Sequence, residues 1–509
     1  MTGTTMFNPD NPTPPEARAV APADAVEPFV LAMDIGSSSA RASVYDAFAR
    51  PIEGSSAKAE HAFTEGADGT AEIDADQVTG EIADLITQAT ASFSPGQIKG
   101  VAMDTFASSL VAVDVGGRAL TPCYTYADSR SAPQLAQLRQ EMDEAAVHQA
   151  VGARLHTSYH APRLLWLART QPIVWKRTAR FLSLGEYIYE RLAGVKGAAT
   201  STMAWTGMLN RHTGDLDENL LAATFTERGQ FGSIIDPDQP VEPKLDVASR
   251  WPALSDAVWF PAIPDGFASN LGAGATDAKN VALSAATSGA MRVIVPGTPE
   301  VLPTGLWAYK VSSTQSIVGG ALNDVGRVML WLESTMAPVT PEELDVALRG
   351  NPVPGIPLML PFLTGERATG WAGNARAVFT GVSSASGPLD MWRGAAEGVA
   401  ISYDRIFKQL SSINPDIERI IALGGVTKWY TATMDIAAKA LGFPIEVVDV
   451  ERVTMRGNAV LALQTLAPER QPATIPVTDA FKPDPTQAAY YADLYDRFEK
   501  AYTANIAER

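Results

Sequence analysis

The feature that most limits how this chain can fold is a strand-turn-strand unit that occurs twice. Each copy has an apolar run of strand length, a short turn rich in Ser, Thr or Gly, and a second apolar run, at residues 29–45 and again at 281–295. Apolar runs of this length that are bounded by turn residues are typical of buried strands. The repeat indicates two lobes that share one plan.

The length and the mixture of elements agree with two lobes. The chain has 509 residues, more than one hydrophobic core usually serves. Strand-like runs alternate with segments of helical spacing, such as 128–142 and 390–413, so we predict an α/β fold. The tail 486–501 carries aromatic residues at helical spacing and is predicted to be a docked amphipathic helix. Residues 1–28, rich in Pro, Ala and Thr, are predicted to be a disordered leader.

Charge and cysteine content restrict the partners. The net charge of -17 argues against a protein that grips nucleic acid or an anionic membrane, because both need cationic faces. The sequence has no apolar stretch long enough for a membrane helix. Cys123 is the single cysteine, so no internal disulfide can form, and the five histidines form no zinc-binding motif. We expect a cytoplasmic protein that acts on small molecules.

The first turn combines a carboxylate with several hydrogen-bond donors. Asp34 ends the first apolar run, and a glycine and three serines follow within the next five positions. Backbone N–H groups and hydroxyls bind phosphate, and a carboxylate binds hydrated Mg²⁺. The alternative is an ordinary hairpin in which Asp and Ser cap their own backbone, and this segment alone does not decide between the two.

Asp265 lies in a Pro-Asp-Gly turn ahead of the glycine-rich segment 270–274. A carboxylate in a cleft accepts the proton of an attacking hydroxyl during phosphoryl transfer. The alternative role for Asp265 is a helix N-cap. The chain has neither a Gly-x-x-x-x-Gly-Lys-Ser/Thr loop nor the protein-kinase motifs, so nucleotide binding requires another design.

Taken in chain order, these segments resemble the FGGY carbohydrate kinases, a family of the actin, hexokinase and Hsp70 superfamily. The resemblance runs from about Phe29 to Tyr502 and includes the aromatic-x-Asp-x-Arg segment 126–130 and the landmark Gly365-Glu366-Arg367. It implies two ribonuclease H-like lobes around a central cleft. Residues 29–274 would form the lobe on the sugar side and residues 275–509 the lobe on the ATP side.

The resemblance also implies roles for individual residues. Asp265 falls at the catalytic-base position and contributes, with Asp34, to a Mg²⁺ site. The residues implied to contact ATP are Ser37, Ser38, Ser39, Thr287, Ser288, Gly289, Gly320, Asn323, Gly424, Gly425 and Asn458. Those implied to contact the sugar are Ala107, Ser108, Ser158 and Asp265. At the second phosphate turn the family has glycine where this chain has Ala286.

The implied activity is the phosphorylation of a small sugar, sugar acid or polyol with ATP and Mg²⁺, and a gluconate-like substrate is favoured. An acid substrate needs a cationic partner, for which Arg41, Arg130 and Arg163 are the candidates. A kinase for a ketose such as xylulose or ribulose is the alternative within the family. Ala286 and the unusual pair Ala107-Ser108 keep open a non-catalytic sugar sensor. An actin-like assembly protein is a third interpretation. The resemblance leaves the oligomeric state open, with a homodimer as one candidate.

Overall fold

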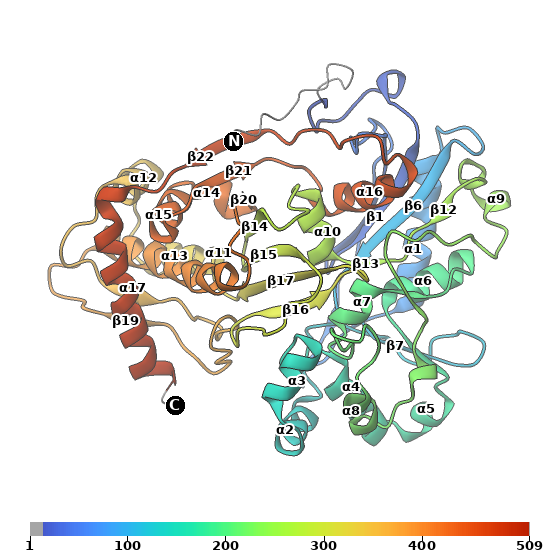
Figure 1. Ribbon diagram of the computed structural model, residues 1–509, viewed down its shortest axis with the longest axis horizontal. Coiled ribbons are helices and arrows are strands. Elements are labelled where there is room, and N and C mark those ends of the chain that lie inside the picture. The colour runs from blue at the N-terminus through green and yellow to red at the C-terminus, as the bar shows by residue number, and fades with distance from the viewer. Residues whose placement is uncertain (1–13, 508–509) are drawn as a thin grey trace, which may run out of the picture.

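The first lobe is built on a mixed sheet of six strands (Figure 1). The computed structural model describes residues 14–507. The sheet order is β3 (Ala57–Glu60), β2 (Ser39–Tyr45), β1 (Phe29–Ile35), β6 (Ile98–Thr105) and β12 (Val258–Trp259), with β13 (Ile263–Pro264) also paired to β6. β1 lies between antiparallel β2 and parallel β6, and every residue of β1 is buried, as expected of a central strand that is covered on both faces.

The second lobe repeats this plan on a sheet of seven strands. Its order is β16 (Trp307–Lys310), β17 (Gln315–Leu322), β15 (Gly289–Pro296), β14 (Asn280–Ala285), β20 (Arg419–Leu423), β21 (Ile445–Val448) and β22 (Val477–Phe481). β14 is antiparallel to β15 and parallel to β20, as β1 is to β2 and β6. In both lobes the first strand therefore has an antiparallel neighbour on one side and a parallel neighbour on the other. This arrangement confirms the predicted α/β fold with two ribonuclease H-like lobes.

Helices of the first lobe cover its sheet and form a cap beside it. α1 begins after Asp74, whose side chain accepts the backbone N–H groups of Asp76 and Gln77. α2 to α5 and α8 gather below the sheet in Figure 1. The helices are α1 (Ala75–Thr90), α2 (Ala132–Glu141), α3 (Glu144–Val151), α4 (His160–Thr170), α5 (Pro172–Arg177), α6 (Leu184–Ala193), α7 (Thr200–Trp205), α8 (Glu218–Ala223) and α9 (Val247–Arg250).

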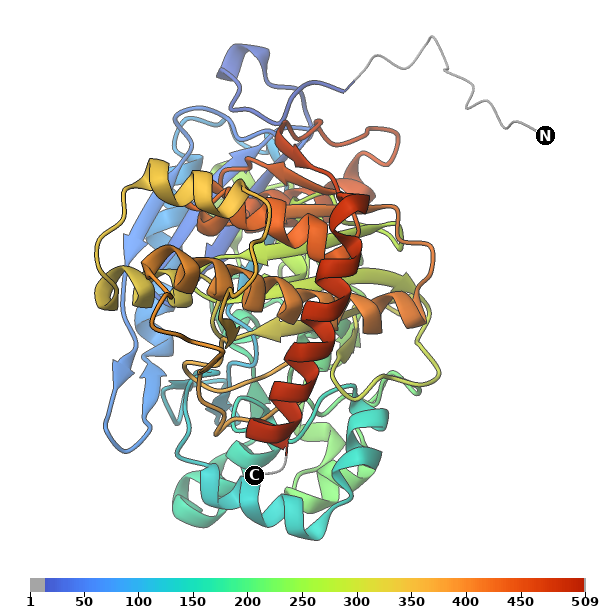
Figure 2. The same cartoon turned by 90° about the vertical axis from the view of Figure 1, so that its left-hand side faces the viewer.

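Helices of the second lobe surround a core centred on one long helix. They are α11 (Gly326–Thr335), α12 (Pro341–Arg349), α13 (Pro388–Ile413), α14 (Gly425–Trp429), α15 (Ala432–Leu441) and α17 (Ala488–Tyr502). α17 lies across the outside of the lobe (Figure 2), where Leu494 and Phe498 enter the hydrophobic core. None of the helices between residues 14 and 507 has the length and apolar character needed to cross a membrane.

Short strands pair outside the two main sheets. They are β4 (Thr64–Glu65), β5 (Ala71–Ile73) and β8 (Cys123–Tyr124), then β7 (Val111–Val113) with β9 (Arg180–Leu182), β10 (Ala198–Ala199) with β11 (Ile234–Ile235), and β18 (Leu358–Leu360) with β19 (Val378–Thr380). β18 precedes the loop that carries the Gly-Glu-Arg landmark.

Two helices cross where the lobes meet. α10 (Asp265–Gly272) follows the last strand of the first sheet, and α16 (Val453–Leu466) follows β21 of the second. A Cβ atom on Gly272 or on Gly457 would overlap with a carbonyl oxygen of the other helix, so only glycine permits this approach. α16 also packs on β1 and β6. A helix from the C-terminal segment thus covers part of the first sheet, and the division at residues 274 and 275 remains a prediction.

Residues 14–28 are ordered, which corrects the prediction of a disordered leader for the described part of that segment. The N–H of Ala17 donates to Thr474 O (2.8 Å), and the N–H of Val20 donates to Pro51 O (2.9 Å). Val20 is buried in the first core. Contacts with distant segments therefore hold this stretch, although its composition is typical of disorder. Residues 1–13 of the predicted leader lie outside the described residues.

Candidate active site

Three carboxylates lie at the ends of adjacent parallel strands. Asp34 in β1 is in register with Asp104 in β6, and Asp265 directly follows β13, which pairs with the end of β6. Parallel strands end at the same edge of a sheet, which is where ligands bind in α/β folds. Asp104 is fully buried, the Asp34 side chain is 12% exposed and Asp265 is half-buried. The fold thus brings both predicted acidic residues together with a third.

Asp104 was not predicted as a site residue. Asn458 from α16 donates its Nδ2–H groups to Asp104 Oδ1 (2.5 Å) and to Met33 O (2.8 Å). Burial, and then the negative charges of Asp34 and Asp265, hold the pKa of Asp104 well above its ordinary value, which favours the neutral acid. In the sequence, Asp104 directly follows the apolar run 101–103. That position at the end of a predicted strand is the signal that could have identified it as a site residue.

Asp34 has a cation on one side and an acid on the other. Arg41 Nη1 lies 3.6 Å from Asp34 Oδ2. Burial raises the pKa of Asp34, while the hydrogen bond with Asp104 and the charge of Arg41 oppose this shift. Because the pKa of Asp104 is the more strongly raised of the two, a negative charge on the pair is favoured on Asp34, the member nearer to solvent.

Asp265 has the environment of a general base. Burial raises its pKa to about 6, although the N–H of Gly266 (2.7 Å) and the charge of Arg292 lower it. A carboxylate with this pKa is ionised at neutral pH and is more basic than an exposed aspartate, which suits proton abstraction. The N-cap position of α10 is Pro264, so the N-cap alternative for Asp265 is wrong.

The turn between β1 and β2 exposes Ser37 and Ser38. The N–H of Gly36 donates to Ser39 O (3.0 Å) and closes the turn. The buried side chain of His61 also supports the turn, because its Nε2 lies 2.8 Å from Gly36 O. The hydroxyls of Ser37 and Ser38 face solvent, whereas Ser39 is 5% exposed. Of the three serines, Ser39 is thus the least accessible to ATP, and the three contacts remain predictions.

The turn between β14 and β15 lies against the start of α11. The carbonyls of Ala286 and Thr287 accept N–H groups from residues 325–327 at 2.8 to 3.2 Å. Thr287 and Ser288 are exposed, as a phosphate-binding turn requires. Ala286 is not among the non-glycine residues of positive φ in the range 14–507, so alanine fits this turn without left-handed strain.

Protein atoms enclose three more residues that were assigned to ATP. A Cβ atom on Gly289 would overlap with the Tyr403 hydroxyl, and one on Gly320 would lie 2.9 Å from Ala368. Asn458 is fully buried beneath Asp104. The two glycines allow close packing and Asn458 positions a carboxyl group, and their contacts with ATP remain predictions.

The other predicted ATP contacts lie nearer to the surface. Gly425 is exposed at the start of α14. Gly424 has a φ of +117° and packs against Ala285 at the end of β14. Asn323 is half-buried and donates an Nδ2–H to Gly365 O (3.0 Å). These contacts remain predictions.

Ala107 and Ser108 lie beside the end of β13, the strand that precedes Asp265. Both line a small cavity with Pro264, the residue before Asp265. Ser108 has a φ of +59°, and its hydroxyl donates to Trp205 O (2.5 Å). A non-glycine residue in this conformation costs about 1 to 3 kcal/mol and is typical of functional sites.

Ser158 lies beside an aromatic cluster that joins the lobes. Its Oγ is 3.0 Å from Nδ1 of His156. The rings of Trp205 and Tyr309 lie tilted with centroids 4.1 Å apart, and the Tyr159 and Tyr309 hydroxyls are 2.5 Å apart. Tyr309 belongs to β16 of the second lobe, so the predicted sugar side receives side chains from both lobes.

The three arginines predicted to bind an acid substrate have structural partners. Arg41 pairs with Asp34, and Arg130 pairs with Glu72 and Asp128 at 2.6 Å each. Arg163 is buried and donates to backbone carbonyls of residues 124, 125, 158 and 159. Their engagement with protein groups corrects this assignment.

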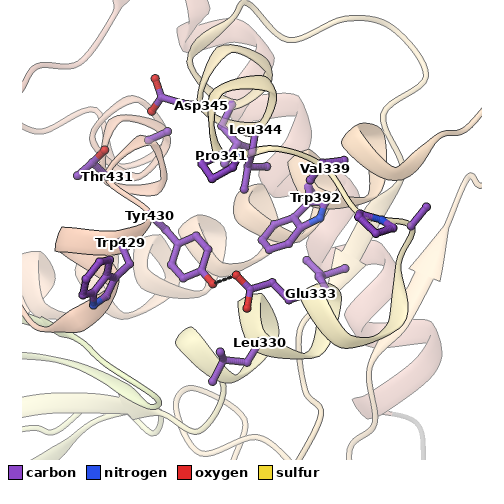
Figure 3. Close-up of a pocket in the computed structure, with 15 residues that line it drawn as sticks. Leu330, Glu333, Val339, Pro341, Leu344, Asp345, Trp392, Trp429, Tyr430 and Thr431 are labelled. Carbon is purple, nitrogen blue, oxygen red and sulfur yellow. Dashed lines mark hydrogen bonds between the residues drawn. The ribbon is translucent and has the colours of Figure 1, made fainter.

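A pocket of about 840 Å³ lies in the second lobe between α11, α12, α14 and α15 (Figure 3). Trp392 and Tyr430 point into it, and the Tyr430 hydroxyl donates to Glu333. Leu330 and Glu333 line the pocket from α11, and the same helix begins at the β14–β15 turn. The remaining lining residues are Leu332, Ala337, Pro338, Val339, Pro341, Leu344, Asp345, Leu348, Trp429, Thr431 and Ala432.

Comparison with known proteins places this geometry in one family. A gluconokinase from Bacillus subtilis (strain 168) is 24% identical over 385 residues, which cover 72% of this chain and 75% of that protein. A xylulose kinase from Klebsiella pneumoniae is 23% identical over 416 residues, with coverages of 80% and 85%. The solved gluconate kinase from Lactobacillus acidophilus superposes with a TM-score of 0.86 at 24% identity over 94% of this chain and 98% of that one.

Two family models match the chain in the order of its two lobes. Residues 29–241 match the N-terminal domain of the FGGY family of carbohydrate kinases, and residues 282–466 match the C-terminal domain. Together the matches cover well over half of the sequence. The chain therefore belongs to the FGGY family of carbohydrate kinases.

Proposed function

We propose that this carbohydrate kinase transfers the γ-phosphoryl group of ATP to a hydroxyl of a small open-chain sugar acid, with Asp265 as general base. The observation that carries the proposal is the position of Asp265 at the edge of the first sheet, half-buried and with its pKa raised to about 6. The names of the gluconokinase and gluconate kinase relatives support an acid substrate.

ATP would lie along the second lobe. The exposed Thr287 and Ser288 would contact its phosphates, and α11 leads from their turn to the pocket of about 840 Å³. Small-molecule pockets of this size are mostly apolar, with a few polar groups that fix orientation. Leu330 and Tyr430 would enclose the adenine ring, with Glu333 as the polar group (Figure 3).

Asp34 and Asp265 suit a Mg²⁺ ion that is bound mainly through phosphates and water. In phosphoryl-transfer sites Mg²⁺ is held by one or two carboxylates together with the substrate phosphates. No cluster of three His, Cys, Asp or Glu side chains that would hold a metal occurs within residues 14–507, so a site with few protein ligands is the one that fits. When bound, the ion would neutralise charge on the phosphate oxygens.

The protein's part in the reaction is proton transfer and positioning. As the substrate oxygen bonds to the γ-phosphorus, its proton passes to Asp265, and the bond from that phosphorus to the bridging oxygen breaks to release ADP. The crossing of α10 and α16 at Gly272 and Gly457 joins the lobes, and closure about this crossing would exclude water.

An assay of ADP release over aldonates, ketoses and polyols tests the proposal. We expect turnover with aldonates. Turnover confined to xylulose or ribulose would establish the ketose alternative, which the similarity to a xylulose kinase favours. ATP binding without turnover on any sugar would instead establish the sensor.

A further inference from the structure

Arg292 and Arg367 are half-buried cations that have no anionic partner in the described part of the chain. No carboxylate of residues 14–507 lies within 4.0 Å of either guanidinium group. Other buried arginines of the C-terminal half have partners: Arg393 pairs with Glu397 at 2.6 Å, Arg405 pairs with Glu366 at 2.8 Å, and Arg456 donates to the carbonyls of Gly272 and Ala473. Removing a charge from water is costly unless an opposite charge compensates it. The two unpaired arginines are therefore arranged to receive an anion.

Arg292 lies beside the proposed general base. Its Nε is 3.9 Å from the position that a Cβ atom would take on Gly266, the residue after Asp265, and the Trp205 ring is 3.6 Å from the same position. The charge of Arg292 lowers the pKa of Asp265, but the two side chains form no ion pair within 4.0 Å. Arg292 thus lies close to Asp265, and its guanidinium donors are not engaged by that carboxylate.

Arg367 approaches the same side of the second lobe. The next residue, Ala368, donates its N–H to Ala321 O of β17 (2.9 Å), and β17 places Gly319 in register with Arg292. Burial, followed by the charge of Arg367, lowers the pKa of His156 to about 4. His156 contacts Ser158, a predicted sugar contact. Arg367 therefore lies near His156, on the side of the cleft that carries Ser158, while Arg292 lies beside Gly266.

The strand position of Arg292 separates it from the proposed phosphate site. Arg292 is three residues beyond Gly289 in β15, or about 10 Å along a strand at its usual rise per residue. Thr287 and Ser288 lie still farther away in that direction. An anion at Arg292 is accordingly a better match to the sugar substrate than to phosphates bound at the turn.

We propose that Arg292 and Arg367 bind the carboxylate of the sugar acid and thereby select acid substrates over neutral sugars. The inference rests on the proposed function and deepens it by naming the residues that recognise the acid group. A planar guanidinium donates two parallel hydrogen bonds to a carboxylate, which makes arginine more selective for this group than lysine. A hydroxyl elsewhere on the open chain would then reach Asp265.

The test compares Arg292→Gln and Arg367→Gln with the matched control Arg118→Gln, which alters an exposed arginine paired with Asp114. Gluconate, its neutral counterpart glucitol, and xylulose serve as substrates. A hydrogen bond to a charged group accounts for about a 10- to 100-fold change in affinity. Arg292→Gln and Arg367→Gln should therefore each raise the KM for gluconate by that factor. The KM for ATP and for any neutral substrate used should change by less than about threefold, as in the control.

Calorimetric titration of gluconate and glucitol into Asp265→Asn protein, with and without each arginine substitution, provides a readout independent of turnover. Loss of gluconate binding alone is the expected result. If a Gln variant fails to fold by circular dichroism, the Lys variant at the same position (Arg292→Lys or Arg367→Lys), which retains the charge, replaces it and should still weaken gluconate binding.

Three outcomes overturn the inference. In the first, the wild type phosphorylates gluconate, but Arg292→Gln and Arg367→Gln leave the KM for gluconate unchanged. This result leaves the proposed function standing. The second is a parallel rise in the KM for ATP, which would assign the arginines to the γ-phosphate. The third is a wild-type enzyme that phosphorylates no sugar acid, and in that case the proposed function fails first.

Discussion

Replacing Asp265 with Asn should slow catalysis and stabilise the fold at the same time. The amide keeps the size of the side chain but cannot accept the proton of the substrate hydroxyl. We expect kcat to fall by about 10² to 10⁴, the usual contribution of a general base. ATP binding should be retained, because the proposed nucleotide contacts lie on the second lobe.

The gain in stability follows from the pKa of Asp265. Its folded-state pKa is about 6, against 3.8 for the free side chain. Because the folded pKa is the higher one, protonation favours the fold, and this contribution is lost as the pH rises through 6. Asn has no proton to lose. At 1.36 kcal/mol per pKa unit, the variant should exceed the wild type by about 1.5 kcal/mol at pH 5 and about 3 kcal/mol at pH 8.

Urea unfolding at pH 5 and pH 8, followed by the fluorescence of the ten tryptophans, measures this difference. Asp238→Asn is the matched control, because Asp238 is exposed and its substitution should leave the gain near zero at both pH values. A gain for Asp265→Asn that does not grow between pH 5 and pH 8 would refute the argument that burial raises this pKa. The kcat/KM of the wild type should rise with pH through about 6, and a profile without that limb would remove Asp265 as the base.

The remaining predictions concern the surroundings of the site. Asp104→Asn mimics the neutral acid and should keep kcat within about tenfold of the wild type. Asp104→Ala removes one of the two acceptors of Asn458 Nδ2 and should cost about 1 to 3 kcal/mol in urea unfolding; equal losses of stability in both variants would contradict a protonated Asp104. Gly457→Ala would overpack the crossing of α10 and α16 and should lower stability by about 1 to 3 kcal/mol. The control Gly80→Ala, on the open face of α1, should raise stability by about 0.5 to 1 kcal/mol. Equal shifts of Tm in the two variants would contradict a tightly packed crossing. Ala286→Gly should change the KM for ATP only a few-fold and lower stability by about 0.4 to 1 kcal/mol, because alanine already fits the turn; a hundredfold gain in kcat would show that alanine impairs the enzyme.

Local sequence patterns were sufficient to predict much of the fold. The two strand-turn-strand units lie within short stretches, so their apolar runs and turn residues predicted β1–β2 and β14–β15 without knowledge of the rest of the chain. Local patterns also marked Asp34 and Asp265 as candidates, since each stands near the end of a strand, whereas their roles came from the resemblance to the FGGY carbohydrate kinases.

Only the tertiary structure decided which of the other residues face the cleft. Asp104 and Asn458 are 354 positions apart, and the burial that makes one a neutral acid and the other its support exists only after α16 packs on the first sheet. Residues 14–28 are ordered by contacts with Pro51 and Thr474. Arg41, Arg130 and Arg163 were plausible partners for an acid by residue type, but nearby carboxylates and carbonyls engage them, whereas Arg292 and Arg367 have no such partners in the described chain. Residue type and spacing determine elements and turns, while burial, pKa and charge pairing arise between segments that are distant in sequence, and so depend on the completed fold.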